Sequence, residues 1–163
     1  MTGVALNIRL ARDLDVLPLA RLYADAVRAA GPAAYAPSQV AVWTAFAEQA
    51  DAFREFILRP RTFVAEDASG PLGFCGLEPD GHIASVYVRG DRLREGIGTR
   101  LLQAAIAHAE QSGIERLFAE ASEFSRPLFL KVGFQAVGAE TVNRDGVTFI
   151  RHQVERRLSR ANG

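Results

Sequence analysis

The segment Ile83–Glu110 restricts the possible folds more than any other part of the chain. Its first six residues, Ile-Ala-Ser-Val-Tyr-Val, are mostly β-branched or aromatic and predict a strand that ends at Val88. A basic turn follows, and Gly96–Gly98 then opens a long stretch with apolar residues at helical spacing. The segment therefore predicts a strand, a glycine turn and a helix in succession.

The glycine turn has the features of an anion site. The first N–H groups of a helix have no partner within the helix, and the helix dipole favours negative charge there. Glycines at the mouth of the helix have no Cβ, so a ligand can approach the main chain closely. We therefore predict a phosphate site. The candidate amides belong to Arg94, Glu95, Gly96, Ile97, Gly98 and Thr99.

Two common phosphate turns fit this sequence poorly. A nucleoside-triphosphate loop requires a Lys after its last glycine, and here Thr99 and Arg100 follow. A dinucleotide-binding turn requires a third glycine where this chain has Leu101. The phosphate ligand is therefore expected to be of another kind.

A third turn matches better, and a second motif lies in order after it. The coenzyme A turn of the GNAT N-acetyltransferases reads roughly Gln/Arg-x-x-Gly-x-Gly/Ala after a strand ending in Val. The stretch Val88–Gly98 resembles it, with Leu93 at the Gln/Arg position. Farther along, Pro127–Phe134 resembles the Phe-Tyr-x-Lys-x-Gly-Phe segment of the same superfamily. The chain is thus identified by resemblance as a GNAT member, most strongly over residues 71–140.

The patterns along the rest of the chain agree with this family. Apolar alternation predicts strands near 4–10, 62–66, 72–78, 82–88, 116–121, 134–140 and 147–158, with helices near 13–30, 38–46, 50–58, 96–111 and from 125. Ser38 and Ser125 are the predicted caps of two of these helices. The fold class is α/β (α+β), a mixed central sheet of six to seven strands flanked by helices. The resemblance implies that the fourth and fifth strands run parallel and splay apart. We expect one domain over residues 1–158 and a frayed tail at 159–163.

Composition excludes several classes of function. The 163 residues include 19 Lys or Arg and 19 Asp or Glu, so no global charge recruits nucleic acid or membrane. The single cysteine, Cys75, excludes a disulfide within the chain, and no Cys/His metal spacing occurs. We see no signal peptide and no long apolar span, and we expect a cytoplasmic enzyme without a metal. Four arginines near the glycine turn either form a solvated loop or steer phosphates: Arg89, Arg92, Arg94 and Arg100.

The resemblance implies direct transfer of an acetyl group from acetyl-CoA to a primary amine of a small molecule or peptide. The pantetheine arm would lie between the splayed strands and pair with the main chain of Val86 and Val88. One of these N–H groups could face the developing oxyanion. Ser122 stands where many relatives have Asn, and it either bonds the coenzyme or simply ends its strand.

The proton donor for the leaving thiolate is harder to place. Many relatives carry Tyr where this chain has Phe129, at the coenzyme end of the site, and Phe has no proton to give. The thiolate could leave unassisted or through water, Ser125 or Tyr87 could substitute, or the chain could bind CoA without turnover. Tyr87 could equally be a packing residue.

For the general base, Glu78 and His82 flank a hairpin at the mouth of the splayed strands. His titrates near neutrality, and Glu78 could act through a water. Either could instead be a solvated turn residue. Ser85 could line the acceptor pocket.

The stretch Tyr35–Trp43 resembles a Tyr-x-x-x-Gln-Ile-x-x-Trp segment in a bacterial GNAT subgroup that also carries Phe at the acid position. It falls where the family builds its acceptor pocket, so Tyr35 and Trp43 are candidate pocket residues, although Trp43 could be helix core. Three alternatives stay open: a CoA-binding module with little catalysis, acetylation of an amine borne by nucleic acid, and a possible homodimer.

Overall fold

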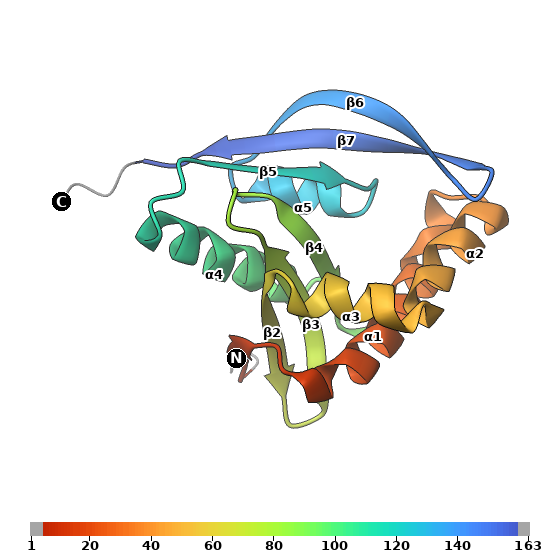
Figure 1. Cartoon of the computed structure of the whole chain (residues 1–163), viewed down its shortest axis with the longest axis horizontal. Helices are drawn as coiled ribbons and strands as arrows, with labels where there is room; N and C mark the ends of the chain where they lie inside the picture. The colour runs from red at the N-terminus through yellow and green to blue at the C-terminus, as the bar shows by residue number, and fades with distance from the viewer. Residues whose placement is uncertain (1–4, 160–163) are drawn as a thin grey trace.

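The computed structural model describes residues 5–159, in which the strands form two antiparallel sheets (Figure 1). The first sheet has the order β1-β2-β3-β4 and the second has the order β5-β7-β6. The strands are β1 Asn7–Leu10, β2 Arg61–Asp67, β3 Gly70–Leu77, β4 Ile83–Val88, β5 Arg116–Ala121, β6 Gln135–Arg144 and β7 Val147–Arg157. The α+β class with a seven-stranded core is therefore confirmed.

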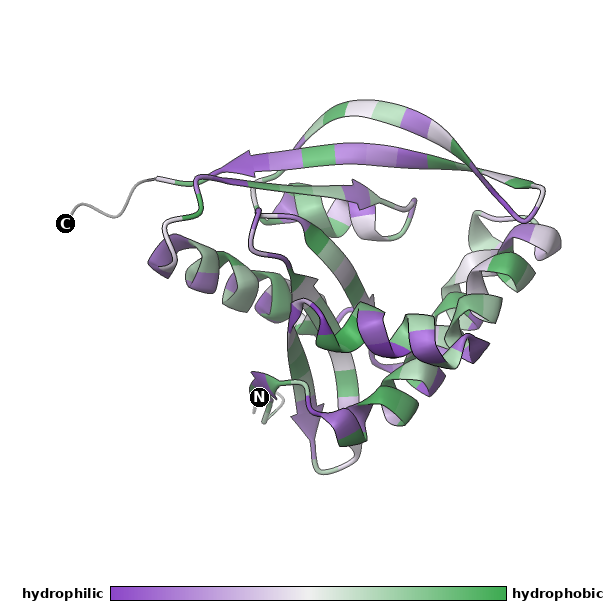
Figure 2. Cartoon of the chain, viewed as in Figure 1, coloured by the Kyte–Doolittle hydropathy of each residue, from purple (hydrophilic) through white to green (hydrophobic). Residues whose placement is uncertain are grey.

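Helices cover both faces of the first sheet. One apolar cluster joins that sheet to α4 and α5, and a second joins its other face to α1, α2 and α3. The helices are α1 Val16–Ala30, α2 Pro37–Ala45, α3 Ala50–Leu58, α4 Ile97–Gln111 and α5 Ser125–Lys131. In Figure 2 the exposed side of α4 is largely hydrophilic, while its buried side carries Leu101, Leu102, Ala105, Ile106 and Ala109. This is the apolar stripe expected of a helix packed on a sheet.

The two sheets meet at the start of β4 and β5. Within residues 5–159, a parallel bridge between His82 and Phe118 is the one ladder contact between the sheets. The Phe118 N–H donates to the Gly81 carbonyl at 3.1 Å. Beyond this point the two strands diverge, and the predicted splay is confirmed.

A bulge bends β4 near this junction. Gly76 of β3 pairs with Ser85, and the next residue, Leu77, pairs with Ile83, so Ala84 is one residue too many on β4. The Ser85 hydroxyl accepts a hydrogen bond from the Gly76 N–H at 2.9 Å. Because of the bulge, Ile83 packs with the α4 cluster while Tyr87 packs with the α1 cluster.

Two predicted helix caps are wrong. Helix α2 begins at Pro37, and the Gln39 side chain accepts a hydrogen bond from the Ala36 N–H at 2.8 Å, so Ser38 is not its cap. At α5 the N–H of Ser125 donates to the hydroxyl of Ser122 at 3.1 Å, so the capping oxygen comes from Ser122. The first strand begins at Asn7, and the predicted part at Val4 and the tail at 160–163 lie outside the described residues.

Candidate active site

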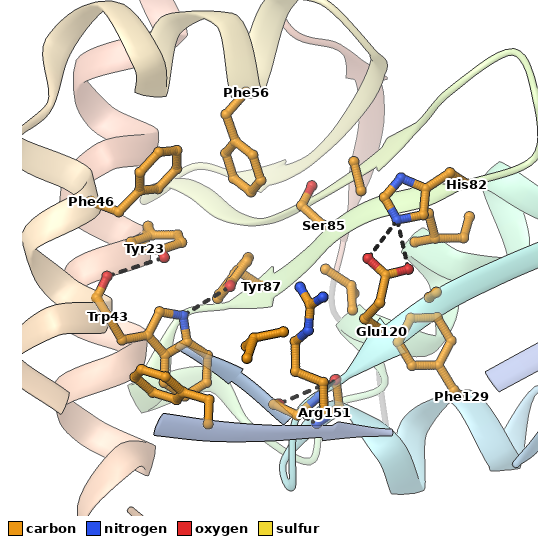
Figure 3. Close-up of a pocket in the computed structure, with 18 of the residues that line it drawn as sticks. Tyr23, Trp43, Phe46, Phe56, His82, Ser85, Tyr87, Glu120, Phe129 and Arg151 are labelled. Carbon is orange, nitrogen blue, oxygen red and sulfur yellow. Dashed lines mark hydrogen bonds and ion pairs between the residues drawn. The ribbon is translucent and has the colours of Figure 1, made fainter. Parts of the chain in front are cut away.

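A cavity of about 450 Å³ lies where β4 and β5 diverge, between the two sheets (Figure 3). Helix α2 and the β6–β7 hairpin complete its wall. Among the sequence-predicted site residues, the cavity brings together Tyr35, Trp43, Glu78, His82, Ser85, Val86, Tyr87, Ser122 and Phe129. Val88 and the glycine turn at residues 94–99 do not line it, which places the predicted phosphate site apart from the predicted acceptor pocket.

His82 lies between two carboxylates at one end of the cavity. Its Nδ1 is 2.7 Å from Glu78 Oε1, and its Nε2 is 3.0 Å from both carboxylate oxygens of Glu120. The imidazole also stacks on Phe118, with ring centroids 5.1 Å apart. The ring is therefore held on three sides. We name this group the carboxylate–histidine row: Glu78, His82 and Glu120.

The two carboxylates change how His82 titrates. The hydrogen bond to Glu120, together with that to Glu78, raises the pKa of His82 to about 9, although burial opposes the shift. The same contact lowers the pKa of Glu120. At neutral pH the imidazole therefore carries both protons, and it becomes a proton acceptor only as the pH rises toward 9. The expectation that His82 titrates near neutrality is wrong for this reason.

The Tyr-x-x-x-Gln-x-x-x-Trp pattern has a physical basis in the cavity wall. The Tyr35 hydroxyl accepts a hydrogen bond from the Glu123 N–H at 2.9 Å, after β5. Gln39 Nε2 donates to the Thr148 carbonyl of β7 at 2.9 Å, and Trp43 Nε1 donates to the Tyr87 hydroxyl at 3.1 Å. The three residues tie the start of α2 and its preceding loop to both sheets. Trp43 is thus a wall of the cavity as well as a packed helix residue.

Two phenols adjoin this wall: Tyr23 is buried and Tyr87 is half-buried. Burial raises the pKa of both Tyr23 and Tyr87, so both stay protonated at neutral pH. The rings lie 4.6 Å apart, and the Tyr23 hydroxyl donates to the Trp43 carbonyl at 3.2 Å. Tyr87 faces the cavity but is already engaged by Trp43, so it combines the two roles that the sequence left open.

Ser85 and Ser122 each hold the local main chain. Ser85 fixes the β4 bulge through Gly76, and it is only 6% exposed. The Ser122 hydroxyl accepts hydrogen bonds from the N–H groups of Phe124 and Ser125, and the Ser125 hydroxyl accepts one in return from the Ser122 N–H at 2.9 Å. Both serines line the cavity while their hydroxyls are engaged in the backbone.

Phe129 on α5 also lines the cavity. Its ring is 2% exposed and meets Phe134 edge to face, with centroids 5.0 Å apart. The position therefore borders both the cavity and the core.

The variant Phe129→Tyr tests whether the outer edge of the Phe129 ring faces the cavity or the apolar core. We expect the variant to fold with its Tm lowered by less than about 4 °C, because the added hydroxyl enters the cavity. Phe134→Tyr is the matched control, since Phe134 does not line the cavity and its hydroxyl would be buried without a partner. Thermal melts followed by circular dichroism compare them, and an equal loss in both variants would contradict this placement of Phe129.

The glycine turn before α4 presents its amides in an unusual backbone. Arg94 has a φ of 67° and Gly96 a φ of 78°, so two left-handed residues lie within three positions. Such alternation makes neighbouring N–H groups converge on an anion. The first main-chain hydrogen bond of the helix runs from the Arg100 N–H to the Gly96 carbonyl at 3.0 Å. The amides of Ile97, Gly98 and Thr99 come before it, so the turn fits a diphosphate.

Glycine is required at positions 96 and 98 for two different structural reasons. A Cβ on Gly96 would meet no atom within 4 Å, so its backbone angle is what requires glycine. A Cβ on Gly98 would lie 2.7 Å from a methyl of Leu128 on α5. Gly98 therefore allows helix α4 to approach α5, which is a reason for glycine that does not depend on a ligand.

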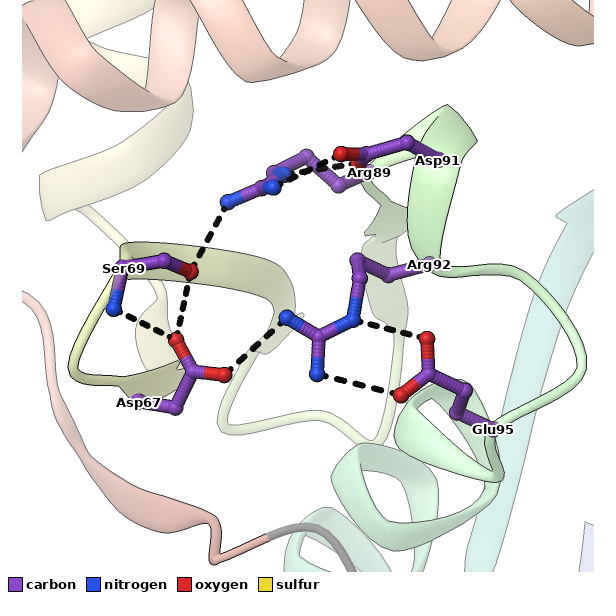
Figure 4. A network of polar contacts seen from close by, with 6 residues as sticks. All are labelled: Asp67, Ser69, Arg89, Asp91, Arg92 and Glu95. Carbon is purple, nitrogen blue, oxygen red and sulfur yellow. Dashed lines mark hydrogen bonds and ion pairs between the residues drawn. The ribbon is translucent and has the colours of Figure 1, made fainter.

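Half of the basic cluster is neutralised within the protein (Figure 4). Arg92 bonds Glu95 at 2.7 Å and Asp67 at 3.0 Å, and Arg89 bonds Asp91 at 2.8 Å. Hydrogen bonds from Ser69, and then the bond from Arg92, lower the pKa of Asp67 to about 2. These pairs fix the loop, and Arg94 and Arg100 supply the positive charge near the turn that has no ion-pair partner among residues 5–159.

Several residues of the site were not predicted from the sequence. Glu120 completes the carboxylate–histidine row, and the β6–β7 hairpin adds Arg144 and Arg151 to the cavity. Glu120 could have been found from the parallel pairing of β4 and β5, because alternation along β5 puts it on the same face as Ser122. The arginines belong to a hairpin whose position depends on the whole fold. The rest of the unpredicted lining is apolar or aromatic, and its aromatic members are Tyr23, Phe46, Phe56 and Phe149.

A family model described as an acetyltransferase (GNAT) domain matches residues 32–156. The chain belongs to the GNAT acetyltransferases. It is therefore an acetyl-CoA-dependent acyltransferase, and the resemblance of its two motifs is confirmed.

Relatives of this GNAT acetyltransferase span nearly its whole length. It is 25% identical over 144 residues to the Escherichia coli (strain K12) protein described as uncharacterized N-acetyltransferase YafP, covering 88% of this chain and 91% of that protein. A GCN5-related N-acetyltransferase structure from Rhodopseudomonas palustris has a TM-score of 0.92 at 23% identity, covering 97% and 99%. PaiA N-acetyltransferase from Thermoplasma acidophilum, solved with coenzyme A, has a TM-score of 0.79 at 15% identity, covering 95% and 100%. These two structures share the fold.

Among residues 5–159, no group of three or more His, Cys, Asp or Glu side chains is arranged to hold a metal ion. In the same residues, no helix combines the length and apolar character needed to cross a bilayer.

Proposed function

We propose that this acetyltransferase moves the acetyl group of acetyl-CoA directly to a primary amine of a small molecule or peptide, within a ternary complex. The observation that carries the proposal is the cavity at the divergence of β4 and β5, with the carboxylate–histidine row at one end. An acyl donor held in the gap and an amine held in the cavity would meet beside the β4 bulge.

The main chain supplies the binding groups for the donor. The amides of residues 94–99 hold the diphosphate, because the left-handed turn and the helix start leave them unpaired. The edge of β4 at Val86 and Val88 pairs with the pantetheine arm. A β4 N–H beside the bulge stabilises the oxyanion as the thioester carbonyl is attacked.

In the reaction a C–N bond forms, the C–S bond breaks and the amine loses one proton. The carboxylate–histidine row accepts that proton, with neutral His82 as the base. Phe129 has no proton to give. The Tyr87 hydroxyl accepts a hydrogen bond from Trp43 Nε1 and keeps its own proton, and it lines the cavity. The leaving thiolate takes its proton from Tyr87 or from solvent.

An amine panel with acetyl-CoA tests this function. We expect thiol release that depends on the amine, together with a mass increase of one acetyl group on the amine. Isothermal titration with coenzyme A, run on the same preparation, reports donor binding independently. Tight binding with no amine-dependent release across the panel would favour a CoA-binding module. A steeply salt-dependent affinity for tRNA would favour an acceptor on nucleic acid.

A further inference from the structure

We propose that the acceptor is a small amine that also carries a carboxylate, an amino acid with an apolar side chain, and that Arg144 binds this carboxylate. The inference rests on the proposed function and names the substrate class of the same cavity. It starts from the charges of both signs that line the cavity.

Arg144 brings an unpaired positive charge to the cavity. It ends β6, is exposed and lines the cavity, and its side chain makes no hydrogen bond or ion pair with any of the residues 5–159. Burial raises the pKa of Tyr23 and Tyr87, and the Arg144 charge acts against that rise in both. Arg144 and both phenols line the same cavity. A guanidinium without an ion-pair partner among the described residues is suited to a carboxylate of a ligand.

Arg151 adds a second, partly neutralised cation. Its Nη2 donates to Glu140 across the β6–β7 pair, but its Nε is buried and has no partner among the described residues. In Figure 3 its side chain points into the cavity from β7. Because Glu140 balances this charge, Arg144 is the main uncompensated cation of the cavity wall.

The other end of the cavity carries the opposite charge. The carboxylate–histidine row has two carboxylates and one imidazolium at neutral pH, which leaves one net negative charge. A protonated amine is attracted to this end, and a carboxylate is attracted to Arg144. A zwitterion matches both ends at once, whereas a polyamine would place a second cation beside Arg144.

The rest of the cavity wall is largely apolar or aromatic, and it sets the kind of side chain. Phe46, Phe56 and Phe149 line the cavity together with Tyr35 and Trp43. The volume of about 450 Å³ lies within the range of small-molecule pockets. An amino acid with an aromatic or branched apolar side chain fits these walls.

Matched amines with and without a carboxylate test the proposal: L-phenylalanine against 2-phenylethylamine, and L-leucine against 3-methylbutylamine. Trp43 is the only tryptophan and lies in the cavity wall, so its fluorescence reports binding to CoA-loaded protein without turnover. We expect each carboxylate-bearing amine to bind at least about tenfold more tightly than its partner, with a similar preference in kcat/KM. Arg144→Gln should remove most of that preference.

Arg157→Gln is the matched control, because Arg157 lies on the same hairpin, exposed and away from the cavity. It should keep the wild-type preference. Equal or reversed affinities in the wild type, or a preference that Arg144→Gln leaves intact, would overturn the proposal. A preference for L-phenylalaninamide equal to that for L-phenylalanine would point instead to a peptide acceptor and also overturn it. Acetylation of only the amines without a carboxylate would sink this inference while the proposed function stands. Binding without acetylation of any amine would sink the proposed function.

Discussion

Gly96→Val is expected to abolish measurable coenzyme A binding while the protein stays folded. A β-branched residue is strongly disfavoured at the φ of 78° found there, so the turn must strain or rearrange its amides. A Cβ at Gly96 would meet no protein atom within 4 Å, so we expect packing to be little disturbed. We expect the Kd for coenzyme A to rise at least about a hundredfold, measured by isothermal titration, since several amides share the diphosphate.

Gly113→Val at the other end of α4 separates this effect from simple strain. Gly113 has a φ of 77° and also has no neighbour within 4 Å of a built Cβ, so the substitution imposes the same backbone cost. Each variant should lose about 1–3 kcal/mol of unfolding free energy. Only Gly96→Val should lose the coenzyme. Wild-type affinity in Gly96→Val, or equal weakening in both, would show that the turn does not hold the diphosphate.

The strand, glycine turn and helix could be predicted because each is a local pattern. The β-branched run, the glycines and the apolar spacing lie within one segment, and the structure has β4 and α4 within a residue of the predicted bounds. The reason for Gly98 was not local. Its neighbour is Leu128, thirty positions away, and only the packing of α4 against α5 brings them together.

The net charge of the basic loop also depends on contacts between residues that are far apart in the sequence. Arg89 and Arg92 look like a phosphate patch when the turn is considered alone. Asp67 ends β2, and the hairpin to β3 carries it to Arg92. Such pairing depends on sheet order, so a count of arginines near a motif overstates the charge that a ligand meets.

The carboxylate–histidine row depends on three segments and on one irregularity. Glu78 and His82 flank the β3–β4 hairpin and could be proposed from it, but Glu120 comes from β5 in the other sheet. Its position follows from the single parallel bridge at which the sheets join. The bulge at Ala84 then decides which face each later residue of β4 presents, and strict alternation along the strand cannot reveal it.

His82→Gln is expected to lower kcat/KM by about a hundredfold or more, because a positioned base contributes that much to amine attack. The pH dependence of kcat/KM shows whether His82 is the general base. His82 has a pKa of about 9, and only its neutral form accepts a proton, so wild-type kcat/KM should rise with pH and level off above that value. The assay should use an acceptor whose amine has a pKa well below 9, because the ionisation of the amine then does not contribute to the pH profile of kcat/KM.

The variant Glu120→Gln shows whether the carboxylate–histidine row determines the pH profile of kcat/KM. The hydrogen bond to Glu120 is the largest cause of the raised pKa of His82, so its loss should move the apparent pKa toward the ordinary histidine value of about 6.5. The chain has three histidines, so proton NMR can follow the His82 ring directly and compare its pKa with the kinetic one. His108→Gln, on α4 outside the cavity, is the control and should leave the profile unchanged. A wild-type profile that persists in His82→Gln would assign the base to another group, with Glu78 acting through water as the next to test, because the row would then only hold the cavity wall in place.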